Sequence, residues 1–276
     1  AILSLMKVLM LDIQLAMEAY IGSYSKQLQD ANRRLEEYNR NLQDMVKQRT
    51  AELESFVYTV SHDLKAPLAA IQGFSIALEE DYASQLDETA IKYLNYIKEN
   101  ALKMDDLIQN LLELSRIGCV ESPYEVVEMR QVVQEAIAQI QPQIEAANVA
   151  LHIQPDFPTV RCGRPRLVQV FVNLLTNAIK YMGENPSPRI QIGWQDRGDF
   201  YELFVTDNGI GIAPQYHEKI FELFQTVQDR KGGQGTGVGL AIVKRIIEYH
   251  KGKVWVVSQK GEGSTFHFTL PKTELW

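Results

Sequence analysis

The chain has 276 residues, of which 45% are hydrophobic and 23% are charged, and its formal net charge is -7. This length predicts about two domains, and the composition allows a packed core. The acidic balance excludes the basic surface that is typical of nucleic-acid-binding proteins. The two cysteines, Cys119 and Cys162, have no metal-ligand spacing, which favours reduced thiols in a cytoplasmic protein over a disulfide between them.

Residues 1–20 are apolar enough to be compared with a membrane span. Lys7, Asp12 and Glu18 interrupt them, and a spanning helix tolerates such charges poorly. No basic region leads a short apolar core, so the segment is not a signal peptide. We therefore expect no membrane span in this chain, and, because it begins at Ala1 rather than Met, we expect an upstream part.

The first 116 residues predict long helices, because they contain only Pro67, Gly22 and Gly73 as helix breakers. Residues 1–54 predict a coiled coil, because apolar residues recur there in alternating steps of four and three, which is typical of a coiled-coil seam. These residues are Met17, Ile21, Tyr24, Leu28, Ala31, Leu35, Tyr38 and Leu42. Successive steps of four up to Thr50 break this heptad as a stutter does. The break is either a site where the helices can change their rotation or register at low energetic cost, or a passive packing adjustment.

Residues 55–117 predict a helical hairpin. Polar residues 81–88 supply the turn, and Asp87 is the predicted N-cap of the second helix. The apolar positions of that helix are Ile91, Leu94, Ile97, Ala101, Met104, Ile108, Leu111 and Leu112. One hairpin has little core of its own, whereas two can pair into a four-helix bundle. Hairpin and coiled coil therefore both predict a homodimer.

Residues 118–123 form the predicted linker, and the pattern changes after them. Strand-like runs lie at 124–128, 149–153, 189–194, 201–206, 253–258 and 265–270. Helical stretches lie at 129–147, 165–182 and 238–250. We expect residues 124–276 to form an α/β sandwich whose sheet is covered on one face by helices, so the whole chain is of the α+β class.

The first motif with chemical meaning lies on the predicted helix 165–182. Asn173, Asn177 and Lys180 are spaced by four and three, so they share one face, and Tyr181 follows. An amide oxygen is a ligand that Mg2+ accepts, and a lysine suits a phosphate. By itself this face is more commonly the polar side of an ordinary amphipathic helix.

Two glycine-containing motifs follow. Asp207, Gly209 and Gly211 come directly after a predicted strand, where the carboxylate can accept a hydrogen bond from an exocyclic amine. The other motif opens a helix, so its amides can meet phosphate, and it consists of Gly235, Thr236, Gly237, Gly239 and Leu240. Taken singly, a turn and a flexible loop explain these motifs. The long polar segment 212–236 between them predicts a lid.

Together and in this order, the three motifs and the lid segment centred on Phe221–Phe224 resemble the N, G1, F and G2 boxes of the histidine kinase and gyrase-type ATPase superfamily. The sequence has no Walker-type loop. The resemblance implies that ATP and Mg2+ bind here, with Asn177 coordinating the metal and Asn173 supporting it. It also implies that Lys180 and Tyr181 approach the phosphates and the adenine, that Asp207 recognises the adenine amine, and that the glycines shape the lid.

A fourth motif lies on the first helix of the hairpin, around His62. The histidine lies beside apolar Val60, Leu64 and Leu68, so we expect it to be partly exposed and able to act as a nucleophile. Pro67 removes a helical hydrogen bond just beyond it.

Residues 61–68 resemble the H box of the dimerisation and phosphotransfer domain of sensor histidine kinases. The resemblance implies that His62 attacks the γ-phosphate of ATP, that Asp63 polarises the ring, and that an aspartate of a response regulator then receives the phosphoryl group. One departure is Ala66, where many relatives have Thr or Asn, and this puts phosphatase activity in doubt.

Residues 9–21 resemble the last helix of sensor-globin domains, which implies a haem-binding globin upstream. A generic connecting helix explains the segment as well. Two further functions fit some of the motifs, a chaperone-like ATPase of the same superfamily and a non-catalytic dimeric scaffold with a degraded nucleotide site. The H box argues against the first, and the intact nucleotide motifs argue against the second.

Overall fold

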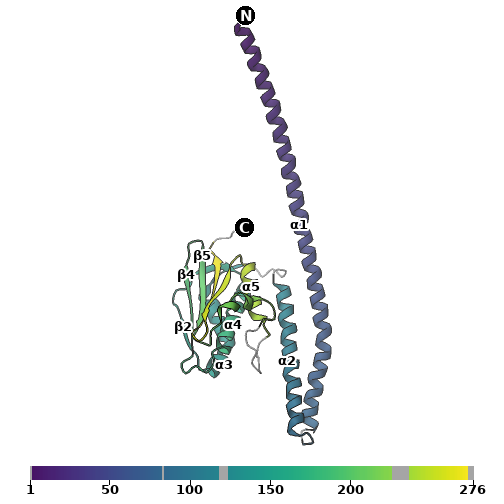
Figure 1. Cartoon of the computed structure of the whole chain (residues 1–276), viewed down its shortest axis with the longest axis vertical. Coiled ribbons are helices and arrows are strands. Elements are labelled where there is room, and N and C mark those ends of the chain that lie inside the picture. The colour runs from purple at the N-terminus through teal and green to yellow at the C-terminus, as the bar shows by residue number, and fades with distance from the viewer. Residues whose placement is uncertain (1, 83, 118–123, 226–235, 273–276) are drawn as a thin grey trace. The chain divides into compact units, whose positions relative to one another are not determined.

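The computed structural model describes residues 2–82, 84–117, 124–225 and 236–272 (Figure 1). The chain divides into two compact units, Ala1–Leu53 and Glu54–Trp276. Helix α1, Ile2–Tyr82, runs through the first unit and continues into the second. Within the described residues, no helix is both long and apolar enough to cross a membrane.

The first unit consists of the N-terminal part of α1. The helix is uninterrupted through residues 38–50, where the heptad breaks. The seam residues are exposed along the single chain, with Leu28 54%, Leu35 59% and Tyr38 64% exposed. Because apolar side chains of a helix need a partner surface, the coiled coil remains a prediction that a second chain would satisfy.

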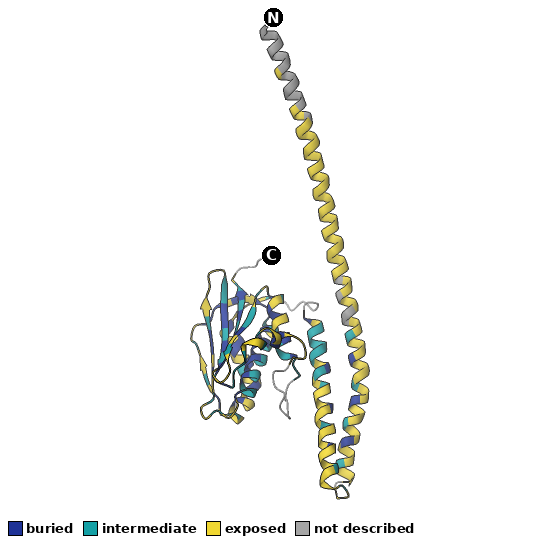
Figure 2. Cartoon of the chain, viewed as in Figure 1, coloured by how far each residue is buried: buried dark blue, intermediate teal, exposed yellow. Residues whose placement is uncertain are grey.

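The second unit begins with a helical hairpin, made by the remainder of α1 and by α2, Glu88–Arg116. The predicted N-cap is confirmed, because Asp87 Oδ1 accepts a hydrogen bond from the Ala90 amide at 2.7 Å. Side chains at seven-residue spacing are buried along the two hairpin helices (Figure 2), and they are Ser61, Leu68 and Ser75 on α1 and Leu94, Ala101 and Ile108 on α2.

Several apolar residues of the hairpin are exposed in the single chain. Val60 and Leu64 are 37% and 45% exposed, and Ile91, Ile97 and Met104 are also exposed. Each hairpin helix thus keeps exposed apolar side chains in the single chain, and the predicted four-helix bundle with a second hairpin stays a prediction. The reason is geometric, since a helix that packs on one neighbour buries only one stripe. The apolar residues outside that stripe stay exposed and could pack against a second chain.

The rest of the unit holds a mixed five-stranded sheet in the order β2-β4-β5-β7-β6. Its strands are β2 Ala150–Ile153, β4 Arg189–Asp196, β5 Phe200–Asp207, β6 Val254–Gln259 and β7 Gly263–Pro271. β2 pairs parallel to β4, and the other pairs are antiparallel.

Three helices cover one face of this sheet (Figure 1), namely α3 Met129–Ala146, α4 Arg164–Lys180 and α5 Gly239–Tyr249. Alternate residues of the strands face them, so Ile190 and Ile192 of β4 are fully buried. Phe171 of α4 meets Phe268 of β7 edge to face, with ring centroids 5.5 Å apart. This confirms the predicted sheet with helices on one face.

A small antiparallel sheet of β1, Glu125–Glu128, and β3, Thr159–Cys162, joins the domain. β3 was not predicted, because four residues with only Val160 and Cys162 buried give a weak alternating signal.

The predicted lid, 212–236, contains two short 3-10 helices, η1 Pro214–Tyr216 and η2 Lys219–Phe221. Part of that prediction, residues 226–235, lies outside the described residues, as does the predicted linker 118–123.

Candidate nucleotide site and phosphoacceptor histidine

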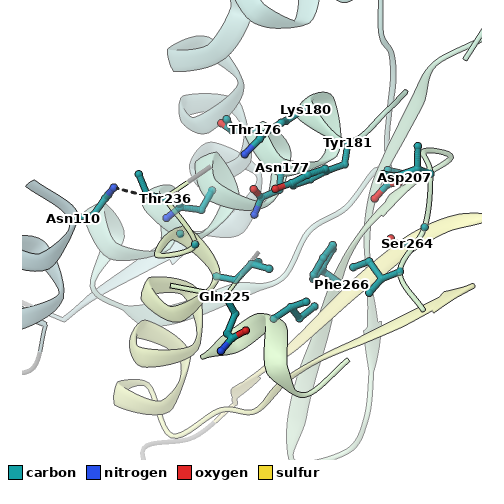
Figure 3. A pocket seen from close by; sticks show the side chains of 18 of the residues that line it. Asn110, Thr176, Asn177, Lys180, Tyr181, Asp207, Gln225, Thr236, Ser264 and Phe266 are labelled. Atoms are coloured by element: carbon teal, nitrogen blue, oxygen red, sulfur yellow. Dashed lines mark hydrogen bonds between the residues drawn. The ribbon is translucent and has the colours of Figure 1, made fainter. Parts of the chain in front are cut away.

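A cavity of about 290 Å³ lies where α4 and β5 end and α5 begins. Most of the predicted nucleotide-site residues line it, namely Asn173, Asn177, Lys180, Tyr181, Asp207, Gly211, Thr236, Gly237, Gly239 and Leu240. Figure 3 shows Asp207 and Ser264 toward one end of this cavity and Thr236 toward the other. Residues far apart in sequence thus form one site.

The α4 wall is polar because of helical periodicity. Asn173, Thr176, Asn177 and Lys180 face the cavity, whereas the other side of α4 is buried in the core. The Lys180 ammonium lies 4.7 Å from the ring centroid of Tyr181, a cation–π contact that keeps both at the rim.

Asp207 is the buried charge of the site, only 7% exposed. Its Oδ1 accepts a hydrogen bond from the Gly209 amide at 2.8 Å. Burial raises the pKa of Asp207 to about 6, although the hydrogen bonds to its carboxylate oppose this. A carboxylate held in a cavity in this way can accept one more donor from a ligand.

The glycines after Asp207 are required by packing. Gly209 does not line the cavity, but a Cβ there would lie 2.4 Å from the Tyr181 carbonyl oxygen. The Ile210 amide donates to that same oxygen at 3.0 Å, which fixes the loop under the end of α4. Gly211 lines the cavity with φ +66°, and a Cβ there would lie 2.0 Å from the Gln259 carbonyl oxygen.

The N-terminus of α5 supplies the opposite wall. Among the residues that the structure describes, no side chain caps it, so its first amides can be offered to an anion. A Cβ on Gly239 would lie only 3.2 Å from Asn173 Oδ1. The absence of a side chain at Gly239 therefore lets α5 pack close to α4. The Gly237 carbonyl accepts from the Phe224 amide at 2.9 Å and so orders the approach to α5. Gly235, the first predicted residue of this motif, lies outside the described residues.

The ligand set fits a metal that arrives with a nucleotide. Among the described residues no cluster of three His, Cys, Asp or Glu could hold a metal ion. Asn173 and Asn177 offer neutral amide oxygens in the cavity. Mg2+ is usually held by few protein ligands together with substrate phosphates and water, so these amides fit it.

Several cavity residues were missed in the sequence. Ser264 and Phe266 point inward at the alternating positions of β7, a signal that was available. Asp106 and Asn110 come from α2, and Asn110 Nδ2 donates to Thr236 Oγ1 at 3.4 Å (Figure 3). No sequence pattern connects α2 to the nucleotide motifs.

His62 and Asp63 lie on α1 and do not line this cavity. Their side chains are 76% and 74% exposed. His62 Nδ1 is 3.4 Å from Asp63 Oδ1, longer than a strong charge-assisted hydrogen bond. Ser61, the residue before it, is only 1% exposed. Successive side chains of a helix point about 100° apart, so His62 points away from the buried side of α1. The structure therefore confirms the predicted exposure of the histidine.

Two family models match the chain. The His Kinase A (phospho-acceptor) domain matches residues 52–119, and the histidine kinase-, DNA gyrase B- and HSP90-like ATPase matches residues 162–274. The chain belongs to the sensor histidine kinases. The match to a phospho-acceptor domain agrees with the H box and argues against a chaperone-like ATPase.

Individual relatives of this histidine kinase chain are only partly covered by it. The methanogenesis regulatory histidine kinase FilI of Methanothrix harundinacea is 45% identical over 227 residues, which is 82% of this chain and 25% of FilI. Cyanobacterial phytochrome A of Nostoc sp. is 39% identical over 80% of this chain and 29% of the phytochrome. The chain therefore spans about a quarter of the length of these curated relatives.

Solved kinases share the fold. The histidine kinase ThkA in complex with the response regulator protein TrrA has a TM-score of 0.57 and 28% identity, and covers 82% of this chain and 64% of ThkA. The match extends over both the helical part of this kinase and its α/β domain, which confirms the predicted fold class.

Proposed function

We propose that this chain is an ATP-dependent protein-histidine autokinase that phosphorylates His62 and passes the phosphoryl group to an aspartate of a response regulator. The observation that carries the proposal is the cavity between α4 and α5, which combines the buried Asp207 carboxylate with the N-terminus of α5 and with Lys180 on the α4 wall. This polarity suits a molecule with an amine-bearing base and a polyanionic tail.

Asp207 would accept the exocyclic amine of adenine, while Lys180 and the α5 N-terminus would face the phosphates. Tyr181 would pack on the base. Mg2+ would be held by Asn177, with Asn173 in support, and would neutralise charge on the phosphates. Gly211, Gly237 and Gly239 would let the backbone approach the ligand, and Gly209 would support the loop from behind by packing under the end of α4. Gly235, Thr236 and Leu240 complete the proposed loop and helix start.

His62 would act through Nε2, because Nδ1 faces the Asp63 carboxylate. Asp63 would hold the proton on Nδ1 and stabilise the positive charge that develops on the ring. The Nε2 lone pair forms the N–P bond as the bond from the γ-phosphorus to the bridging oxygen breaks, and the electron pair leaves with ADP. Positioning would supply most of the catalysis.

Domain movement is part of this proposal, because His62 does not line the nucleotide cavity. We assign residues 1–54 to a signalling coiled coil, 55–117 to the dimerisation and phosphotransfer hairpin, 118–123 to a linker and 124–276 to the catalytic domain. The chain would work as a cytoplasmic homodimer, and an upstream sensor, such as a haem-binding globin, would bias it through the coiled coil.

Incubation with γ-labelled ATP and Mg2+ tests the proposal. Wild type should take an acid-labile, alkali-stable label, and His62→Gln and Asn177→Ala should each abolish it. Hydrolysis of ATP without label would favour a chaperone-like ATPase. Absence of ATP binding would favour the non-catalytic scaffold.

A further inference from the structure

A second cavity, of about 490 Å³, lies beside His62. Its charged lining residues are Lys65 of α1, Glu113 and Arg116 of α2, and Arg166 of α4. Three cations and one carboxylate give this lining a net charge of about +2 with a neutral histidine. The excess is local, since the chain as a whole has a formal charge of -7.

The cations reach the cavity from three helices. Lys65 lies three residues after His62, so the two side chains share a face of α1. Arg116 is the last residue of α2, and Arg166 lies in the first turn of α4 with a side chain only 17% exposed. The fold, rather than a single basic stretch, concentrates positive charge here.

Among the described residues, the two polar contacts of the Arg166 guanidinium are long. Its Nη1 is 3.9 Å from Glu113 Oε1 and 3.4 Å from Gln169 Oε1. Both distances exceed the roughly 2.7–2.9 Å of a charge-assisted hydrogen bond. A planar guanidinium has five donors, so it can engage an oxyanion in two places at little cost in lost contacts.

We propose that this cavity holds the phosphoryl group on phosphorylated His62, with Arg116 as the main phosphoryl-binding residue on the hairpin and Arg166 as its counterpart on the catalytic domain. A phosphoryl group adds a charge of about -1.5 to -2 and three acceptor oxygens, which matches the excess positive charge of the lining. Glu113 opposes the phosphoryl group and competes for Arg166. The inference rests on the proposed function, since it requires that His62 is phosphorylated.

The equilibrium of the reaction tests this inference more directly than its rate. For chain plus ATP going to phosphorylated chain plus free ADP, the equilibrium constant depends on the two forms of the chain and not on the affinity of the nucleotide site. The full chain is brought to a fixed ratio of ATP to ADP from both directions, and the phosphorylated fraction is measured with label.

Arg116→Gln should lower this equilibrium constant by roughly tenfold, the size expected for a hydrogen bond to a charged group, and Arg116→Lys should restore most of it. Glu113→Gln should raise the constant, because it removes a repelling carboxylate. Lys103→Gln on the exposed surface of α2 removes an equal charge outside the cavity and should leave the constant within about twofold of wild type.

A structural role for the cavity would lower the constant in both Arg116→Gln and Glu113→Gln, and this result would overturn the inference. Values for both variants within about twofold of wild type would overturn it as well. A wild-type chain that takes no label would contradict the proposed function itself, whereas a labelled wild type with unresponsive variants would contradict only this inference.

Discussion

At the scale of single residues, the nucleotide site combines the polar face of α4 with the buried carboxylate of Asp207. Asn173, Asn177 and Lys180 share a face because of helical spacing, and the structure places all three in one cavity. The state of Asp207 was not predictable, because burial by β7 and the loop after β5 raises its pKa and no local pattern shows that burial. Asp106 and Asn110 were missed for the same reason, since they reach the cavity only through tertiary packing.

The raised pKa of Asp207 gives a pH prediction. The carboxylate must be ionised to accept a donor on both oxygens, so adenosine affinity should fall as pH drops below about 6. Adenosine is the suitable probe because it has no phosphate to titrate. Calorimetry should show that Asp207→Asn binds about tenfold more weakly at pH 7.5 and has lost the pH dependence.

Asp199→Asn is the matched control, since Asp199 is exposed and does not line the cavity. Its adenosine affinity should follow wild type at each pH. An Asp207→Asn variant that keeps both the affinity and its pH dependence would contradict the role given to this carboxylate.

At the scale of elements, the helices of the catalytic domain were predictable within a residue or two of their ends, because each has a clear apolar face. β3 was not, since it pairs with β1 from a distant part of the sequence, and the residue after it is bonded by a side chain at the end of α5. His250 is only 4% exposed, its Nε2 accepts from the Gly163 amide at 3.1 Å, and its Nδ1 donates to the Ile246 carbonyl at 2.8 Å. This side chain therefore links α5 to the segment between β3 and α4.

These two bonds require a neutral ring, since a protonated Nε2 would face a donor. Burial lowers the pKa of His250 below its ordinary value, and Arg166 adds to this, while the Ile246 carbonyl opposes it. Tyr124 and Tyr249 are the ring neighbours. The contribution to stability is therefore complete above the unfolded pKa, about 6.5, and is lost as pH falls through the lower folded pKa.

Denaturant unfolding at several pH values checks this. Between pH 6.5 and 5, wild type should lose up to about 1.4 kcal/mol per pH unit through His250, and His250→Gln should show a smaller loss. The exposed His152 gives the control variant His152→Gln, which should keep the wild-type slope. Identical slopes for wild type and His250→Gln would show that His250 does not titrate in this way.

At the scale of the whole molecule, the order of helical and α/β parts was predictable from helix breakers and periodicity. What the sequence could not show is which apolar stripe of the hairpin stays within the chain. Leu94, Ala101 and Ile108 pack against α1, whereas Ile97 and Met104 are 47% and 48% exposed. Both stripes are apolar, so only the packed structure distinguishes them.

The exposed stripe predicts a homodimer. Ile97→Glu would place a charge in the buried interface and should weaken dimerisation at least tenfold by analytical ultracentrifugation. Asn95→Glu adds the same charge on α2 away from both stripes and should leave the dimer intact. A monomeric wild type, or equal effects of the two variants, would contradict this role for the stripe.

The most direct test of the account is the position of the phosphoryl group on the chain. Phosphorus NMR of the chain after incubation with ATP and Mg2+ distinguishes phosphorylation on the two ring nitrogens, and peptide mapping identifies the histidine. Because Nδ1 faces Asp63, we expect one phosphohistidine, at His62, phosphorylated on Nε2. A phosphoryl group on Nδ1, or on a residue other than His62, would contradict the account.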